Sequence, residues 1–214
     1  MPERPDYYQL VDFYEEQLRL HGDCSQGVGW KDSRSNRVRF SVMLEMLTFA
    51  GAGACSILDF GCGLGHFYKY LQEVGRDDIA YFGMDLSDNF IDIARKKYPN
   101  VDFFCTDIFN SPKLPITVDF IIANGVFTQK RGISNSRMDR FFVEAITILF
   151  DNARRGIAVN VMSPVVDWRR DGNFHLPLSR VEEIASTLSN RFLIRHDYGL
   201  HEYTLYLFKP DSVA

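Results

Sequence analysis

The sequence predicts an α/β protein with a mostly parallel, doubly wound sheet, helices on both faces and one reversed strand near the C-terminus. Short apolar runs alternate with helical patterns along most of the chain, which is typical of right-handed strand–helix–strand units. Only a short turn separates the last two apolar runs, too little for a parallel crossover. The 214 residues are enough for one domain with a substantial core.

The N-terminal part of the chain predicts two helices. Apolar residues recur at helical spacing from Tyr7 to Leu18, and a polar loop that carries Trp30 follows. A second helix is expected from about Arg37 to Ala50. We expect residues 1–50 to form a helical cap near the ligand end of the sheet. Residues 51–214 then form the α/β domain, in one compact unit with the cap.

Strand and helix patterns alternate beyond residue 50. Short apolar runs predict strands at residues 57–60, 79–84, 101–105, 118–123, 156–162, 192–195 and 203–208. Helical spacing predicts helices at residues 67–74, 89–98, 137–152 and 180–189.

Composition excludes several classes of function. A formal net charge of −4 argues against a nucleic-acid partner, which would need a basic face. No apolar run approaches the roughly 20 residues of a membrane helix. The four cysteines form no C-x-x-C spacing or cysteine–histidine cluster, so no metal site is expected. The polar N-terminus and the unpaired cysteines favour a cytoplasmic protein, expected to be a monomer or homodimer.

One glycine-rich stretch, SILDFGCGLGHF, follows the first predicted strand and is expected to cradle a cofactor. A dinucleotide loop needs G-x-G-x-x-G, but His66 stands where its third glycine would be, and Gly65 comes one residue early. Asp59 at the strand end is also a poor neighbour for phosphates. A cofactor with an ammonium group and no phosphate suits this loop better, and S-adenosylmethionine has both properties.

Two further acids support the same cofactor. Asp85 ends the second predicted strand, where its carboxylate can accept hydrogen bonds from both ribose hydroxyls. Asp107 follows the third strand, where it is expected to accept from the adenine amino group; the alternative is a loop acid in an Asx turn. The expected cofactor-binding residues of these three loops are Asp59, Phe60, Gly61, Cys62, Gly63, Gly65, Asp85, Leu86, Thr106, Asp107 and Ile108.

Four segments in order, ILDFGCGLG, MDLSDNFIDIARKKYP, FFCTDIF and VDFIIANGVF, resemble the motif series of class I S-adenosylmethionine-dependent methyltransferases. The resemblance covers roughly residues 55–210. It implies a Rossmann-like sheet with strand order 3-2-1-4-5-7-6 and an antiparallel strand 7. The tail RHDYGLHEYTLYLFKP, with GVGW and RVRF before the first strand, is similar to a group of small bacterial methyltransferases of poorly defined substrate.

Further cofactor contacts are expected from the fourth strand end and the N-terminal region. Asn124 and Gly125 end that strand in the sequence NGVF, which lacks the prolines of the N-P-P-Y/F motif and so disfavours a nucleobase or glutamine acceptor. Trp30 is interpreted as a lid residue or as a core anchor. Arg37 and Arg39 either reach the cofactor carboxylate or belong to a solvated helix face.

The implied strand order places the start of strand 7 beside the end of strand 5. His201 and Glu202 are therefore expected on the acceptor side, with His196 behind them, although a single histidine here is more often a surface or turn residue. Trp168 and Phe174 lie in the long loop after strand 5, where they can line an acceptor pocket.

The predicted function is methyl transfer from S-adenosylmethionine to a small-molecule acceptor. Oxygen or nitrogen is favoured over carbon as the acceptor atom. The sulfonium carries an activated methyl group, so the protein contributes mainly alignment and desolvation. Two alternatives stay open: an NAD(P)-dependent oxidoreductase, and a non-catalytic module that binds S-adenosylmethionine.

Overall fold

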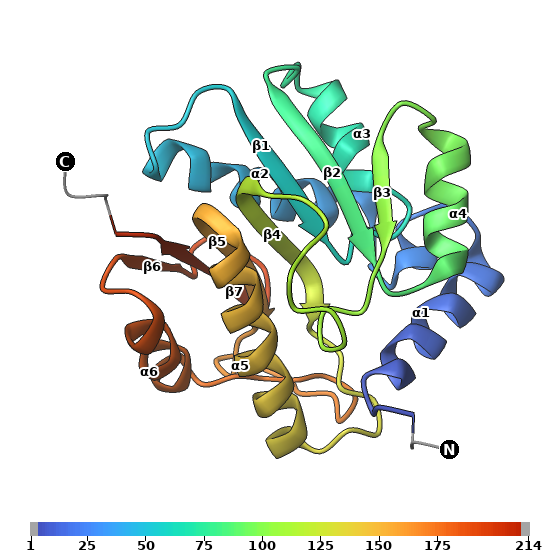
Figure 1. The fold of residues 1–214 in the computed structure, drawn as a ribbon. Coiled ribbons are helices and arrows are strands. Elements are labelled where there is room, and N and C mark those ends of the chain that lie inside the picture. The colour runs from blue at the N-terminus through green and yellow to red at the C-terminus, as the bar shows by residue number, and fades with distance from the viewer. Residues whose placement is uncertain (1–3, 211–214) are drawn as a thin grey trace.

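The computed structural model describes residues 4–210 and confirms the predicted architecture (Figure 1). Its seven-stranded sheet has the order β3-β2-β1-β4-β5-β7-β6. The strands are β1 (Cys55–Phe60), β2 (Ile79–Asp85), β3 (Asp102–Cys105), β4 (Val118–Phe127), β5 (Ala153–Met162), β6 (Phe192–Arg195) and β7 (Glu202–Phe208). The first five strands pair in parallel, and β7 runs antiparallel to both β5 and β6.

The helices match the predicted pattern with small shifts at their ends. They are α1 (Tyr8–His21), the short 3₁₀ helix η1 (Gln26–Val28), α2 (Ser33–Phe49), α3 (His66–Glu73), α4 (Asp88–Lys97), α5 (Asn135–Asn152) and α6 (Leu178–Leu188). α2 begins earlier than expected because Asp32 caps it: the Asp32 Oδ1 accepts a hydrogen bond of 2.7 Å from the backbone N–H of Ser35.

β4 differs from its prediction because it continues past residue 123. Its ladder with β5 is regular from the pair Phe120–Gly156 to Ala123–Val159 and resumes at Phe127–Val161. From Ala123 to Phe127 the chain of β4 advances four residues while β5 advances two. Asn124 and Gly125 therefore lie in a bulge inside the strand and not at its end. Gly125 has φ +88°, which a glycine adopts without strain.

Two apolar clusters cover the two faces of the sheet. α2, α3 and α4 pack on one face, and α5 and α6 pack on the other (Figure 1). Of the two N-terminal helices expected to form a cap, α2 packs on a face of the sheet. α2 buries Phe40, Met43 and Met46 against the sheet, and the hydroxyl of Tyr206 in β7 donates to the Val42 carbonyl at 2.7 Å.

Candidate cofactor and acceptor site

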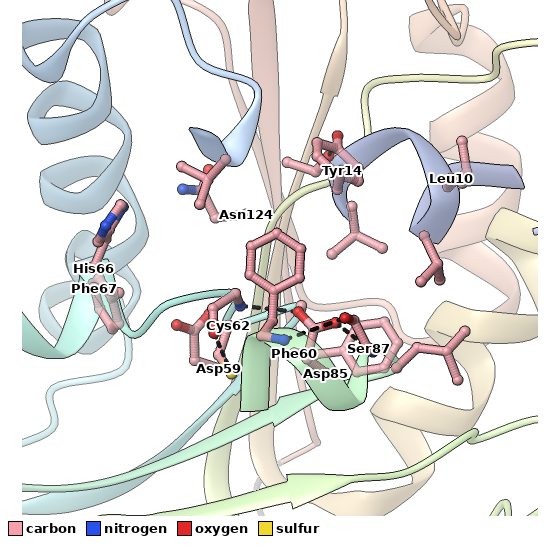
Figure 2. A pocket seen from close by; sticks show the side chains of 18 of the residues that line it. Leu10, Tyr14, Asp59, Phe60, Cys62, His66, Phe67, Asp85, Ser87 and Asn124 are labelled. Atoms are coloured by element: carbon pink, nitrogen blue, oxygen red, sulfur yellow. Dashed lines mark hydrogen bonds between the residues drawn. The ribbon is translucent and has the colours of Figure 1, made fainter. Parts of the chain in front are cut away.

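A cavity lies at the carboxyl ends of β1 to β4, between the sheet and α1 (Figure 2). Leu10 and Tyr14 of α1 lie across it from Asp85 and Ser87. The cavity wall includes most of the residues predicted for the cofactor: Trp30, Asp59, Phe60, Gly61, Cys62, Gly63, Asp85, Leu86, Thr106, Asp107, Ile108, Asn124 and Gly125. Gly65 and Arg39 are not part of the wall.

Other residues of the wall were missed by sequence reasoning. They are Tyr7, Leu10, Val11, Tyr14, Val28, Asn36, Phe40, His66, Phe67, Ser87, Phe90, Phe109, Val126 and Phe141. The apolar face of α1 is visible in the sequence as a helical repeat, but periodicity alone does not distinguish a face that covers a cavity from one that packs on a core.

Each glycine of the loop has a different structural role. A Cβ on Gly61 would lie 2.4 Å from the Val126 Cγ2, so this glycine permits close packing of β1 against the β4 bulge. Gly63 has φ +52° and its N–H donates to Asp85 Oδ2 at 2.9 Å. Gly65 has φ +72° and forms the N-cap of α3, which explains its absence from the cavity wall.

Asp85 is held in place by the backbone around it. Besides the bond from Gly63, its Oδ1 accepts from the Ser87 N–H at 3.0 Å. Burial raises the pKa of the Asp85 carboxyl, while these N–H groups oppose the shift because they stabilise the anion. Asp85 therefore presents a fixed carboxylate at the floor of the cavity.

Asp59 is the most deeply buried acid of the cavity, with 4% of its surface exposed. The hydroxyl of Tyr81 donates to its Oδ2 at 3.0 Å. Burial nevertheless raises the pKa of Asp59 to about 7, because the single hydrogen bond does not offset the lost solvation. A cationic ligand group beside Asp59 would hold it ionised.

Asp107 forms the Asx turn that the sequence left open as the alternative to a cofactor contact. Its Oδ1 accepts from the Phe109 N–H at 3.0 Å, and its Oδ2 accepts from Asn110 Nδ2 at 2.7 Å. The Tyr7 hydroxyl also donates to Oδ2, at 2.8 Å. The Tyr7 ring packs against Phe109 and Phe141, with centroids 4.9 Å and 5.6 Å away, so aromatic side chains close this end of the cavity.

Polar contacts fasten α1 over the cavity. The hydroxyl of Tyr14 donates to the Gly125 carbonyl at 3.3 Å, and burial raises the pKa of Tyr14 to about 12, so it is a donor at neutral pH. The Ser87 hydroxyl donates to Glu15 at 2.5 Å. After the helix, the Asp23 carboxylate lies 2.7 Å from both His66 Nε2 and Lys97 Nζ.

Arg39 and Glu202 form a buried ion pair. Arg39 Nε lies 2.5 Å from Glu202 Oε1, and their side chains are only 12% and 1% exposed. The guanidinium of Arg39 also stacks on the Trp30 ring, 3.9 Å from its centroid. Neither residue belongs to the cavity wall, and the roles expected of them, a cofactor contact for Arg39 and an acceptor-side position for Glu202, stay predictions.

The remaining acceptor-side candidates also lie outside the cavity wall. The backbone N–H of Ser163 donates to the His201 carbonyl at 3.0 Å, which confirms that the start of β7 lies beside the end of β5. The His201 side chain is exposed and packs on Trp168, with ring centroids 5.1 Å apart. His196 is exposed as well, and Phe174 is a core residue with 2% exposure.

Two further properties concern the whole described chain. Within residues 4–210, no group of three or more His, Cys, Asp or Glu side chains is placed to hold a metal ion. Over the same residues, no helix combines the length and apolar character needed to span a bilayer.

Some known proteins are similar to this chain in sequence, and others are similar to it in fold. A family model described as Methyltransferase domain matches residues 57–151. A putative methyltransferase of Mycobacterium tuberculosis is 26% identical over 161 residues, which are 72% of this chain and 93% of that protein. A malonyl-[acyl-carrier protein] O-methyltransferase of Yersinia pestis is also 26% identical, over 72% of this chain, but the chain spans only 54% of that relative.

Among solved structures, magnesium protoporphyrin IX methyltransferase from Synechocystis PCC 6803 with bound S-adenosylmethionine superposes with a TM-score of 0.66. The match covers 98% of this chain and all of the other, at 15% identity, which speaks for the fold alone. Residues 57–151 are thus similar to a methyltransferase domain, most of the chain is similar to a putative methyltransferase, and the sheet shares the fold of a solved S-adenosylmethionine-dependent methyltransferase.

Proposed function

We propose that the enzyme transfers a methyl group to an oxygen or nitrogen atom of a small-molecule acceptor. The observation that carries this proposal is the cavity itself. It joins the four sequence motifs on one side to α1 on the other, and aromatic and aliphatic side chains make up much of its wall. A site of this kind suits a small ligand, because it buries most of the ligand surface and leaves a few polar groups to orient it.

The cavity residues fit the cofactor in charge and in space. Gly61 and Gly63 let the backbone approach the ligand, since no Cβ intervenes. We assign Asp85 to the ribose hydroxyls, Asp59 to the ammonium group and Asp107 with the backbone of Ile108 to the adenine edge. Among the described residues, Asp107 Oδ1 accepts one hydrogen bond, from the Phe109 N–H, so this oxygen keeps a lone pair for the adenine amino group.

The bound sulfonium supplies an electrophilic methyl group, and the protein is left to bind, orient and exclude water. The cavity wall carries the carboxyl groups of Asp59, Asp85 and Asp107, which are assigned to the cofactor, and the imidazole of His66. We therefore infer that catalysis rests mainly on alignment and desolvation of the acceptor.

Oxygen is the acceptor atom named for one relative, the malonyl-[acyl-carrier protein] O-methyltransferase of Yersinia pestis. This supports oxygen as one of the two proposed acceptor atoms. The catalytic roles of His201, Glu202 and His196 stay predictions. For Glu202 the structure favours a structural role, because its carboxylate is buried against Arg39. We also propose that the protein works in the cytoplasm as a monomer or homodimer.

Calorimetry followed by a transfer assay tests the proposal. S-adenosylhomocysteine should bind with a single site, whereas NAD and NADP should give no heat. Tritium from the labelled methyl group of S-adenosylmethionine should then enter a compound of a metabolite extract. Binding of NAD without S-adenosylhomocysteine would support the oxidoreductase, and cofactor binding without transfer to any fraction would support the non-catalytic module.

A further inference from the structure

Asn36, on the first turns of α2, is a buried polar residue with an unpartnered atom at the cavity. Its surface is 4% exposed, and it belongs to the cavity wall. No hydrogen-bond partner for its side-chain oxygen Oδ1 is present among the described residues. Because a buried acceptor without a donor costs free energy, such an atom in a cavity wall points to a donor on the ligand.

The neighbours of Asn36 place it at the glycine-loop end of the cavity. One turn further along α2, the Phe40 ring packs against Phe67, with centroids 5.4 Å apart, and Phe67 lies in the first turn of α3 after the glycine loop. Val28, shortly before α2, lies 3.6 Å from the position of a Cβ on Gly63. The opposite end of the cavity is closed by Tyr7, Phe109 and Phe141.

The wall beside the glycine loop contains buried acceptor oxygens that have no hydrogen-bond donor among the described residues. Asn124, in the bulge of β4 that packs on Gly61, also has a buried Oδ1 without a partner among the described residues. Asp59 adds a buried carboxylate. Three side-chain acceptors from β1, α2 and β4 match a group that donates several hydrogen bonds and carries positive charge, and an ammonium group has both properties.

We propose that Asn36 is a cofactor-binding residue outside the four sequence motifs, and that its Oδ1 accepts a hydrogen bond from the ammonium of the cofactor's amino-acid end. Asn124 is the second amide acceptor and Asp59 the counter-ion. This inference rests on the proposed cofactor site, and it adds a contact from the N-terminal region that orients the methionine part of the cofactor.

Comparing two ligands isolates the contribution of this contact to affinity from that of the rest of the site. S-adenosylhomocysteine carries the amino-acid end, and 5′-methylthioadenosine shares its adenosine and sulfur but lacks that end. In the Asn36→Leu variant, calorimetry should show the affinity for S-adenosylhomocysteine reduced about 10- to 100-fold, because a charge-assisted hydrogen bond is lost. The affinity for 5′-methylthioadenosine should be unchanged. Asn36→Asp keeps an acceptor oxygen and should keep most of the affinity for S-adenosylhomocysteine.

The controls distinguish failure of this inference from failure of the proposed site. If the wild-type protein binds neither ligand, the cofactor site itself is wrong. If the wild type binds both and Asn36→Leu weakens neither, or weakens both equally, the role of Asn36 is overturned. Asn135→Leu changes an exposed asparagine at the start of α5 and should alter neither affinity.

Thermal unfolding without ligand checks that the variant protein is intact. Asn36→Leu removes an unsatisfied buried oxygen, so its melting temperature should not fall. Should this variant fail to fold, Asn36→Ser is measured with the same two ligands, and the ratio of the two affinities decides in the same way.

Discussion

Arg39 and Glu202 form a buried ion pair that ties α2 to the start of β7, with Nε and Oε1 2.5 Å apart. Arg39 also stacks on Trp30, and a Cβ on Gly125 would lie 2.3 Å from the Trp30 ring. The Gly125 N–H donates in turn to Asn160 Oδ1 at 2.6 Å. The ion pair therefore supports two cavity-wall residues, Trp30 and Gly125, without itself touching the cavity.

Breaking this pair from one side should be costly. Arg39→Met leaves the Glu202 carboxylate buried without its cation, and Glu202→Gln leaves the guanidinium without its anion. We expect each single variant to lower the free energy of unfolding by about 3–5 kcal/mol. The double variant Arg39→Met/Glu202→Leu should recover much of this loss, because no uncompensated charge remains. Urea unfolding of the wild type and the three variants measures the coupling energy between Arg39 and Glu202. A loss of less than about 1 kcal/mol in each single variant would contradict this prediction.

A fluorescence measurement shows whether the pair positions Trp30. The chain has two tryptophans, so Trp168→Phe leaves Trp30 as the sole tryptophan emitter. Its emission should change on titration with S-adenosylhomocysteine and saturate at the affinity found by calorimetry. In the same background, Arg39→Met should reduce that change. If the emission does not change on addition of S-adenosylhomocysteine, Trp30 does not lie beside the bound cofactor.

Cofactor binding should depend on the ionisation of Asp59. Its pKa of about 7 means that it is mostly neutral at pH 6 and mostly ionised at pH 8. Because the ligand's ammonium group is stabilised by the anion, affinity for S-adenosylhomocysteine should rise as pH increases through 7. Asp59→Asn should flatten this rise. Asp85, whose pKa is raised by burial, and His66, whose pKa is lowered by burial, also belong to the wall and remain in the variant as internal controls.

The same group should make the ligand-free protein less stable at high pH. In the unfolded chain the pKa of an aspartate is about 3.9, and in the folded chain that of Asp59 is about 7. Its contribution to stability is therefore fully present below about pH 4 and is lost as pH rises through 7. At pH 8, Asp59→Asn should raise the free energy of unfolding by about 1–3 kcal/mol. A smaller difference is expected at pH 5, where wild-type Asp59 is still protonated.

Asp85 should contribute to affinity through hydrogen bonds to the ribose. Asp85→Ala is expected to weaken the binding of S-adenosylhomocysteine by about 1–3 kcal/mol. The substitution also leaves the N–H groups of Gly63 and Ser87 without their acceptor. Asp85→Asn, which keeps one acceptor for them, should lose less. Adenine alone has no ribose, so its binding, measured as a competitor, should change little. Unchanged affinity for S-adenosylhomocysteine would show that the ribose lies elsewhere.

Much of the fold was predictable from local patterns. Apolar runs and helical repeats located every strand, and the short turn before β7 required it to be antiparallel. Helix ends were less predictable, as the start of α2 shows, because the Asp32 cap depends on one side-chain hydrogen bond. The bulge in β4 was missed because Asn124 and Gly125 interrupt the apolar run and so indicate a strand end. Only the pairing with β5 reveals that the strand resumes at Phe127.

By itself, the sequence determined the elements, the position of the glycine loop and the acids that follow the strands, because periodicity, turn chemistry and residue order are local properties. The tertiary structure decided which distant side chains meet. Tyr7 reaches Asp107 across 100 residues, Arg39 pairs with Glu202, and Asn36, whose side-chain oxygen has no partner among the described residues, joins the cavity wall. Such contacts depend on how α1 and α2 pack against the finished sheet, and no local propensity encodes that packing.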